Sequence, residues 1–438
     1  MIIEGIIGDS ARHYAGLAGM SREEWKQSTK FAPKDLGWII MFIGGAIGAG
    51  IVFLPVQVGL VGLWVYIFGA LAGYPVLYRQ QRYYLNVLAE ADECKDFTDA
   101  ISSYMGKNWG FALGILYFMQ VAILIFLYAT ALNNDSASFL VTFHVTGESL
   151  ASSSWYSLGL VCLLVLIASQ SEKLIMKLSS FMVFAKLITV AVLGCVMIQY
   201  WNLLNLGPFP DLLYFCKEFI VILPLVTMSI AFFSNLSPAV VSYRKNSPNK
   251  FVAQYKAMRA MNLAYLSLVV IVVFYTVSFN LSVSHEQAVQ AFEANISSLA
   301  MAARNMDGTL VKILSLILNI FAVVTAFFAI FMAFRDSCVG LAVNILQRFV
   351  RADRIHRKEI TAGVSVFCVL LCWSVIALNI PVVHLASLLG PLMGLIGCIM
   401  PVCIICHIPS LKKYRGPWLL AVFLIGVLLV VSPFIALG

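Results

Sequence analysis

The chain carries very little charge for its length. Asp, Glu, Lys and Arg make up only 11% of its 438 residues, whereas 61% are hydrophobic and the mean hydropathy is +0.91. Soluble domains are about 25% charged, so this composition excludes a soluble globular protein. Polar stretches long enough to fold as a separate domain are also absent. We therefore expect one membrane domain over residues 35–438, preceded by an N-terminal tail at 1–34.

Motifs of several other function classes are missing. No Walker A sequence is present, so ATP does not drive this protein directly. The apolar segments hold almost no Asp, Glu or His, which a membrane enzyme would need in clusters. Residues 403–407 (Cys-Ile-Ile-Cys-His) fit the c-type haem pattern, but our topology places them on the cytoplasmic side, and that haem is attached on the outer side. We expect no enzyme activity, no cofactor and no metal site.

What the chain does have is a series of long apolar stretches. A spanning helix needs about 20 apolar residues, and eleven stretches are candidates for spans. They lie at 36–56, 60–84, 109–132, 155–170, 177–200, 216–241, 261–282, 309–334, 360–379, 384–406 and 418–437. The sequence therefore predicts an all-α integral membrane protein with about eleven spanning helices.

The basic residues set the predicted orientation. With the N-terminus in the cytoplasm, most of the 29 Lys and Arg residues fall in cytoplasmic loops, as the positive-inside rule requires. Only Lys217, Arg304 and Lys312 fall on the other side, and Lys186 falls inside a helix. The basic residues are separate loop anchors beside the lipid bilayer, so we expect no nucleic-acid partner. Eleven spans put the C-terminus, Gly438, on the periplasmic side.

Two of the apolar stretches carry residues that interrupt a helix. The first contains Gly44, Gly45, Gly48 and Gly50, and glycine costs about 1 kcal/mol per residue against alanine in a helix interior. Loosened backbone is tolerated in hydrocarbon only where it faces protein or a water-filled cavity. The sixth contains Pro238, which removes one backbone donor and obstructs the carbonyl of the residue four positions earlier. The sequence predicts breaks at both places.

The positions of the two breaks indicate a transporter. Spans one and six correspond if five-helix units at 35–200 and 216–406 repeat with inverted topology, which leaves 418–437 as an extra helix. Paired interrupted helices of this kind form the substrate site of many secondary transporters. A solute channel, the competing function, would usually need a repeated ring of carbonyls or charges, and none is visible.

The chemistry of such a site fits a zwitterionic amino acid. Loosened backbone at 46–50 offers N–H donors at a half-helix N-terminus, which favours a carboxylate. Carbonyls at the loosened C-terminal end of the other half-helix, around Phe233 and Ser234, suit an ammonium group, and Asn235 is a further candidate beside them. The predicted backbone contacts at the first break come from Ala46, Ile47, Gly48, Ala49 and Gly50.

Three motifs carry a resemblance to a known family. They are 45–50 (Gly-Ala-Ile-Gly-Ala-Gly) followed by 53–55 (Phe-Leu-Pro), Ser237-Pro238 with Ser242-Tyr243, and 409–416 (Pro-Ser-Leu-Lys-Lys-Tyr-Arg-Gly). They resemble those of the hydroxy and aromatic amino acid permeases of bacteria, in the larger amino acid, polyamine and organocation transporter group. The likeness is closest to the serine permeases, including a branch that handles D- and L-serine.

The resemblance implies a function and a location. It implies a five-plus-five inverted repeat and proton symport of serine across the bacterial cytoplasmic (inner) membrane, with threonine as a further substrate candidate. An aromatic amino acid permease of the same family is the alternative. No required protein partner is evident from the sequence; the expected partners are a small amino acid, protons and lipid.

Lys186 is the most unusual ionisable residue in the sequence. It lies nine residues after Lys177, hence about 13 Å deeper in the fifth span, and a charge at a helix centre costs about 2.5–3.5 kcal/mol. Proton-coupled relatives place a lysine on this helix where sodium-coupled relatives bind their ion, so the resemblance implies a coupling role. A structural tether is the alternative. Thr325, near the middle of the eighth span, is a candidate polar partner of the coupling site.

Two residues of the third span and one external segment complete the predicted site. Tyr128 either caps the substrate from outside or is an interfacial aromatic residue, and Gln120 is a candidate to bond the substrate hydroxyl. The segment from Ser284 to Arg304 is amphipathic, and Ser284 with Gln287 has capping-box spacing. We predict a helical lid there, over the outer vestibule.

Overall fold

The computed structural model describes residues 15–91, 97–169, 172–306, 308–346 and 357–436, and these form helices and connections with no strand. The prediction of an all-α protein is confirmed. The helices are α2 (Arg22–Ser28), α3 (Pro33–Ala46), α4 (Ala49–Val61), α5 (Leu63–Glu90), α6 (Phe97–Met105), α7 (Lys107–Thr142), α8 (Ser154–Ala168), α9 (Glu172–Met197), α10 (Leu212–Ile230), α11 (Phe233–Lys245), α12 (Lys250–Ser282), α13 (His285–Glu293), α14 (Ser298–Asn305), α15 (Thr309–Asn319), α16 (Thr325–Leu346), α17 (Arg357–Ala377), α18 (Val382–Met393), α19 (Met400–His407) and α20 (Trp418–Ala436).

The helices correspond to the predicted spans. Within the described residues, eight are long and apolar enough to cross a membrane, or nine when α3 and α4, bent by 42° at their break, count as one span. The other two predicted stretches are helical too. α8 has only 15 residues, and α5 has 28 but includes Arg79 and Arg82. The chain is therefore a multipass membrane protein.

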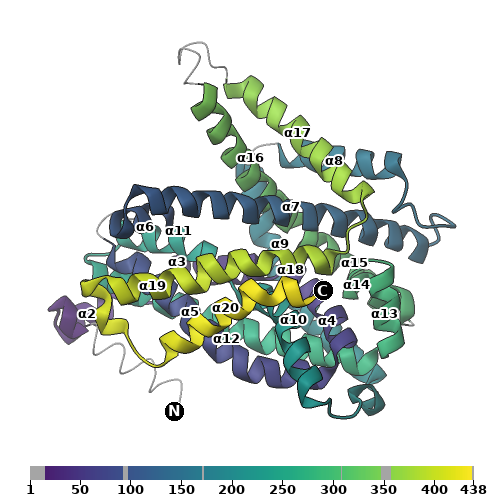
Figure 1. Ribbon diagram of the computed structural model, residues 1–438, viewed down its shortest axis with the longest axis horizontal. Helices are drawn as coiled ribbons and strands as arrows, with labels where there is room; N and C mark the ends of the chain where they lie inside the picture. The colour runs from purple at the N-terminus through teal and green to yellow at the C-terminus, as the bar shows by residue number, and fades with distance from the viewer. Residues whose placement is uncertain (1–14, 92–96, 170–171, 307, 347–356, 437–438) are drawn as a thin grey trace.

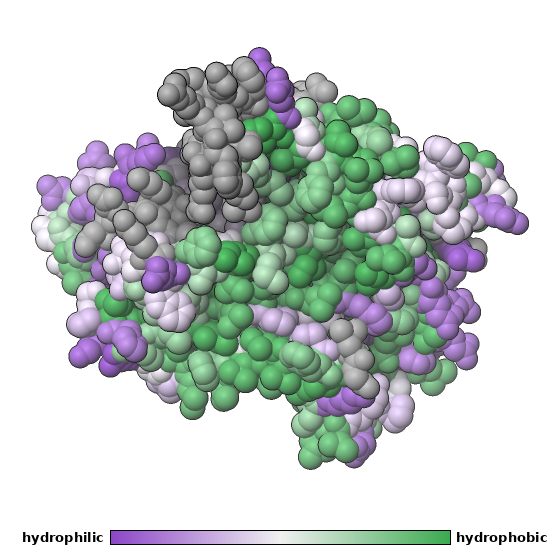
Figure 2. Space-filling view, turned by 45° about the horizontal axis from the view of Figure 1, so that its top comes forward, coloured by the Kyte–Doolittle hydropathy of each residue, from purple (hydrophilic) through white to green (hydrophobic). Residues whose placement is uncertain are grey.

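The long helices pack side by side and present an apolar surface. In Figure 1, α7 and the α18–α19 pair run along the long axis, while α16, α17 and α8 form a group above them. Figure 2 shows hydrophobic residues over the middle of one face and hydrophilic residues at its two ends. Large hydrophobic side chains such as Leu71, Phe111 and Phe367 are among those exposed on the molecule. A broad apolar band between polar ends is what a bilayer covers.

Two of the spanning segments contain π-helical turns that the sequence did not predict. Ile320–Val324 joins α15 to α16, and Gly394–Ile399 joins α18 to α19. Such turns leave the regular hydrogen-bond ladder and are frequent at functional sites. The first of them directly precedes Thr325.

The segment predicted to form a lid folds as two short helices, α13 and α14. The capping box formed by Ser284 and Gln287 at the start of α13 is confirmed. Ser297 and Ser298, where α14 begins, are fully buried, and α14 packs on α4, α7 and α15. α14 is thus inserted between spanning helices and does not lie flat on the surface. We call this end of the bundle the α14 end.

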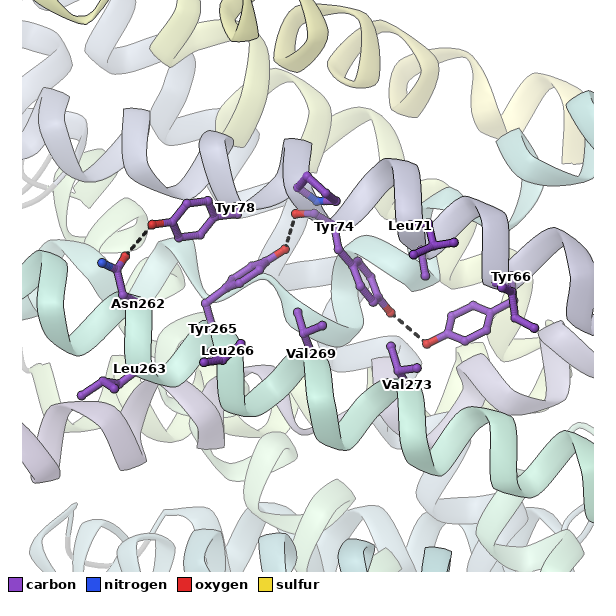
Figure 3. A pocket seen from close by; sticks show the side chains of 13 residues that line it. Tyr66, Leu71, Tyr74, Tyr78, Asn262, Leu263, Tyr265, Leu266, Val269 and Val273 are labelled. Carbon is purple, nitrogen blue, oxygen red and sulfur yellow. Dashed lines mark hydrogen bonds between the residues drawn. The ribbon is translucent and has the colours of Figure 1, made fainter. Parts of the chain in front are cut away.

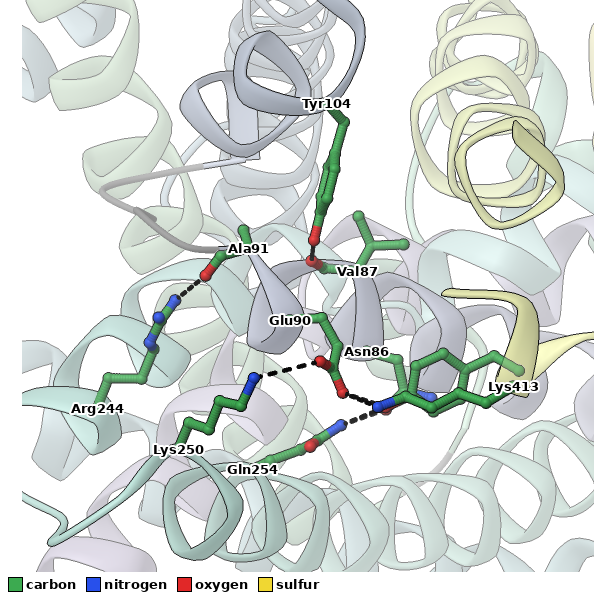
Figure 4. A network of polar contacts seen from close by, with 10 residues as sticks. Asn86, Val87, Glu90, Ala91, Tyr104, Arg244, Lys250, Gln254 and Lys413 are labelled. Carbon is green, nitrogen blue, oxygen red and sulfur yellow. Dashed lines mark hydrogen bonds and ion pairs between the residues drawn. The ribbon is translucent and has the colours of Figure 1, made fainter. Parts of the chain in front are cut away.

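The opposite end, which carries α2, the α11–α12 connection and residues 409–415, is rich in Lys and Arg, and we call it the basic end (Figure 1). Glu90, at the last turn of α5, accepts hydrogen bonds from Lys413 at 2.5 Å and from the Tyr414 hydroxyl at 2.8 Å, and lies 3.8 Å from Lys250 (Figure 4). Arg244 donates to the carbonyl of Ala91 at 2.5 Å. These contacts tie α5 to α11, to α12 and to the segment before α20.

Candidate substrate and coupling site

The first predicted break lies within the glycine run. α3 ends at Ala46, Ile47 and Gly48 are outside regular helix, and α4 begins at Ala49. The first N–H groups of α4 have no acceptor within that helix, and the helix dipole makes this end favourable for an anion. The backbone here can therefore bind a carboxylate.

Close contacts explain why glycine occupies this stretch. A Cβ on Gly48 would overlap the hydroxyl of Tyr128 and lie 3.7 Å from Cβ of Ala326. A Cβ on Gly50 would lie 2.6 Å from the backbone of Met228 and Ser229 in α10. The glycines thus let three other helices, α7, α16 and α10, approach the broken span.

The second break lies within the predicted interruption but ahead of Pro238. We expected the sixth span to be interrupted between Ser229 and Pro238; α10 ends at Ile230 and α11 begins at Phe233, with Pro238 inside α11. The prediction that Phe233 and Ser234 follow the end of a half-helix is wrong, because they begin one. The carbonyl of Ser234 still lacks its intrahelical donor, since Pro238 has no N–H.

A side chain from another helix explains the position of this break. Gln81 of α5 donates through Nε2 to the carbonyl of Ile230 at 3.2 Å and accepts from the N–H of Phe232 at 3.3 Å. One amide thus satisfies a free acceptor and a free donor on the two sides of the break. Gln81 is fully buried. The sequence analysis missed it, although two adjacent glutamines in an apolar segment were a visible signal.

The two breaks lie against each other. Phe42 of α3 stacks on Phe232, with 4.9 Å between ring centroids. Asn235 of α11 donates through Nδ2 to the carbonyl of Met41 at 3.3 Å, and a Cβ on Gly45 would overlap that amide nitrogen. Asn235, predicted for the second half of the site, therefore lies against α3 just ahead of the first break.

Lys186 lies beside the first break. It is 1% exposed, and its Nζ donates to the carbonyl oxygen of Ile47 at 3.2 Å. This places a cation at the C-terminal end of α3, where the helix dipole favours positive charge. No described acidic side chain forms an ion pair with Lys186.

The remaining predicted residues differ in their surroundings. Tyr128 is buried next to Gly48, whereas Ser234 is exposed. The hydroxyl of Thr325 donates to the carbonyls of Phe321 and Ala322 in its own span, so these bonds do not connect it to Lys186. Gln120 lies on α7, the helix of Tyr128, and its buried Oε1 has no hydrogen-bond partner among the described residues.

Comparison with known proteins places this geometry in a family. No family model matches the chain. It is 48% identical over 436 residues to a protein of Escherichia coli O157:H7 named serine transporter, covering 99% of this chain and 98% of that protein. The chain belongs to the hydroxy and aromatic amino acid permeases, in the serine transporter branch. It is also 25% identical over 403 residues to the serine transporter SdaC of Escherichia coli K12, covering 90% and 91% of the two chains.

Among solved structures, the permease is similar to the crystal structure of MhsT in complex with L-phenylalanine. The TM-score is 0.49 at 13% sequence identity, over 92% of this chain and 98% of that one.

A large groove in the permease lies between helices other than the broken spans. It has a volume of about 610 Å³ and runs between α5 and α12 (Figure 3). The hydroxyls that reach it are paired: Tyr66 with Tyr74 at 3.0 Å, Tyr78 with Asn262 at 3.0 Å, and Tyr265 with the carbonyl of Tyr74 at 2.6 Å. Its remaining walls are apolar and include none of the predicted site residues. A zwitterion would leave its charges unpaired there, so the breaks remain the better substrate site.

Proposed function

We propose that this permease imports serine by proton symport across the bacterial cytoplasmic membrane, with the N-terminus in the cytoplasm and Gly438 in the periplasm. The α14 end is then periplasmic and the basic end cytoplasmic. The 48% identity to a serine transporter over 99% of the chain supports the substrate. The hydrogen bond from Lys186 to Ile47 is the observation that carries the coupling mechanism.

The substrate is proposed to bind between the two breaks. Its carboxylate takes the N–H groups at Ala49 and Gly50, where α4 begins. Its ammonium lies toward backbone carbonyls near the second break. One of these, the carbonyl of Ser234, has no intrahelical donor. Tyr128 closes the space above Gly48, and Gln120 offers its unpaired Oε1 to the hydroxyl of serine.

Coupling is proposed to act through the first break. The protonated ammonium of Lys186 holds the end of α3 through the Ile47 carbonyl. When it loses its proton, the nitrogen keeps donors but loses the charge that favours this position at the helix end. α3 is then free to move relative to α9. A cycle of binding and release of this proton links the movement of α3 to proton flux, which is the alternating access that symport requires.

Uptake of labelled serine into proteoliposomes under imposed proton or sodium gradients tests the proposal. We expect accumulation with a proton gradient and none with sodium alone. Transport that only equilibrates serine would contradict symport and indicate a channel. Gly48→Leu serves as the binding-negative control, because its side chain would fill the space against Tyr128; serine uptake by this variant at normal expression would remove the first break from the site.

Competition for the same uptake tests the substrate. A site that bonds the serine hydroxyl leaves polar groups unpaired when alanine binds, which can cost orders of magnitude in specificity. We expect unlabelled serine to compete better than alanine or tryptophan. Threonine should compete less well than serine but better than alanine or tryptophan. Tryptophan or tyrosine as the best competitor would assign the chain to the aromatic branch instead.

A further inference from the structure

Three consecutive polar residues occur near the end of α7, and all are buried. Asn133, Asn134 and Asp135 continue an otherwise apolar helix beyond the stretch predicted to span. Asn133 donates to the carbonyl of Ala151 at 2.9 Å, and Asn134 to the carbonyl of Asn295 at 3.2 Å. Asn133 and Asn134 thus connect α7 to the segments that contain Ala151 and Asn295. Asp135 provides a third connection.

The carboxylate of Asp135 is bound by hydrogen-bond donors only. Its Oδ1 accepts the N–H of Ser297 at 2.8 Å, and its Oδ2 accepts from Nδ2 of Asn319. Ser297 is the N-cap of α14, where the helix dipole favours negative charge. We call these three residues the Asp135 cluster. The arrangement matches the ionised form, because both oxygens face donors.

No cation within the described residues compensates this buried charge. Asp135 is 0% exposed and takes part in none of the ion pairs of the described residues. Intramembrane ionisable groups are costly and are functional by default. The elements that pack around α7 carry charged and titratable side chains, and within the described residues none of these is hydrogen-bonded or ion-paired to Asp135. They include His384 on α18, Arg304 on α14, Lys312 on α15, Arg335 and Asp336 on α16, and Lys358 and Glu359 on α17.

The Asp135 cluster is connected to the proposed site by two routes. Ser298, next to Ser297, donates to the carbonyl of Val52 in α4 at 2.6 Å, so α14 is bonded to the second half of the broken first span. Asn319 ends α15 and is followed by the π-helical turn Ile320–Val324, which packs on α7 and on α9, the helix of Lys186.

We propose that Asp135 is a second proton-coupling residue of this permease, acting as a positioning residue for the periplasmic gate. In its ionised form the carboxylate holds α14 and α15 against α7 and closes the site at the α14 end. A proton taken from the periplasm occupies one carboxylate oxygen, and the donor that faced that oxygen loses its acceptor. The cluster then weakens and α14 can move away from α4. This inference rests on the proposed proton symport.

The test compares Asp135→Asn, Asp135→Glu and wild-type protein in proteoliposomes. Asparagine resembles the neutral acid in shape and cannot take up a proton at accessible pH. We expect serine counterflow, which needs no net proton movement, to persist in Asp135→Asn. Accumulation driven by a pH gradient should fall by about 5-fold or more, the lower end of usual coupling energies, and the dependence of uptake on external pH should flatten. Asp135→Glu, which keeps a titratable carboxyl, should keep the dependence of uptake on external pH.

A control and a second variant keep the inference open to refutation. Glu286→Gln removes an exposed carboxylate at the same end and should leave the pH profile unchanged. Asn319→Asp places a second carboxyl against Asp135. Two neighbouring carboxylates repel each other, so one of the pair keeps its proton to higher pH. The midpoint of the pH profile of uptake should therefore move to higher pH. This variant gives an answer even if Asp135→Asn does not fold.

The outcomes separate this inference from the proposed function. Wild-type protein that does not accumulate serine in a pH gradient would contradict proton symport itself. Wild-type accumulation together with an unchanged pH profile in Asp135→Asn, or in Asn319→Asp, would overturn the role of Asp135 and leave proton symport intact.

Discussion

At the scale of residues, the site combines groups that are each unfavourable alone. The buried ammonium of Lys186 bonds to a backbone carbonyl, that of Ile47, and the glycines of the first span lower helix stability but leave room for Tyr128 and α10. Such costs persist where function requires them. The two roles proposed for Lys186, coupling and structural tether, predict different results for one substitution.

Lys186→Ala should abolish accumulation of serine driven by a pH gradient, whereas serine exchange should persist because exchange needs no net proton movement. Lys186→Arg should also fail to accumulate serine, since a guanidinium does not release its proton at accessible pH. The tether role predicts that arginine, which preserves the charge, supports substantial activity. Labelled uptake and exchange in proteoliposomes measure both. An arginine variant that concentrates serine against its gradient would leave Lys186 as scaffold only.

At the scale of elements, each break has backbone groups that hydrogen-bond to a side chain from a helix distant in the sequence. Lys186 of α9 contacts the first break and Gln81 of α5 contacts the second. Buried backbone groups without partners cost about 1–3 kcal/mol each, so the breaks need these side chains. These side chains therefore stabilise the two breaks by pairing the Ile47 carbonyl, the Ile230 carbonyl and the Phe232 N–H.

Gln81→Leu should destabilise the permease and reduce serine binding, because it leaves the Ile230 carbonyl and the Phe232 N–H unpaired, at about 1–3 kcal/mol for each group. Gln80→Leu is the matched control, since the amide of Gln80 makes one hydrogen bond among the described residues, to the carbonyl of Gly397 at 2.8 Å. Thermal unfolding in detergent with and without serine measures the difference. Equal effects of the two substitutions would contradict a special role for Gln81 at the break.

The elements also show what the sequence could and could not predict. The first break was located correctly because the glycines that destabilise the helix lie in the span itself and can be read from the local sequence. The second break lies earlier than Pro238 because its position depends on Gln81, a contact between residues 149 positions apart or more. Asp135 was missed because the apolar stretch ends at 132, whereas the helix continues to Thr142 through contacts with α14 and α15.

At the scale of the whole molecule, buried carboxylates hold both ends of the bundle. The Asp135 cluster lies at the α14 end. At the basic end, Asp35 of α3 pairs with Arg259 of α12 at 3.0 Å and accepts from the Tyr243 hydroxyl of α11 at 2.8 Å. These contacts bind the start of the first span to the end of the sixth. If the permease works by the alternating access proposed above, we expect one of the two clusters to open while the other stays closed.

The pair at the basic end should therefore set how readily the permease opens to the cytoplasm. Asp35 is only 1% exposed and Arg259 16%, and removing one partner of a buried pair costs about 3–5 kcal/mol. Asp35→Asn should raise the population open at the basic end, so that fewer molecules present the site to the periplasm. The apparent affinity for external serine falls in proportion to that fraction, and the KM for uptake should rise by about 5-fold or more.

A second pair at the same end provides the comparison. Lys413 and Glu90 also form an ion pair, but the side chain of Lys413 is 45% exposed, and exposed pairs contribute about 0–1 kcal/mol. Lys413→Gln should therefore leave the KM nearly unchanged. The double variant Asp35→Arg with Arg259→Asp, which keeps opposite charges at the two positions, should recover part of the loss. Serine uptake kinetics in proteoliposomes measure both variants. If Asp35→Asn and Lys413→Gln change the KM equally, the Asp35–Arg259 pair does not control opening. A gate that closes on a buried ion pair must respond to the loss of that pair far more than to the loss of a solvated one.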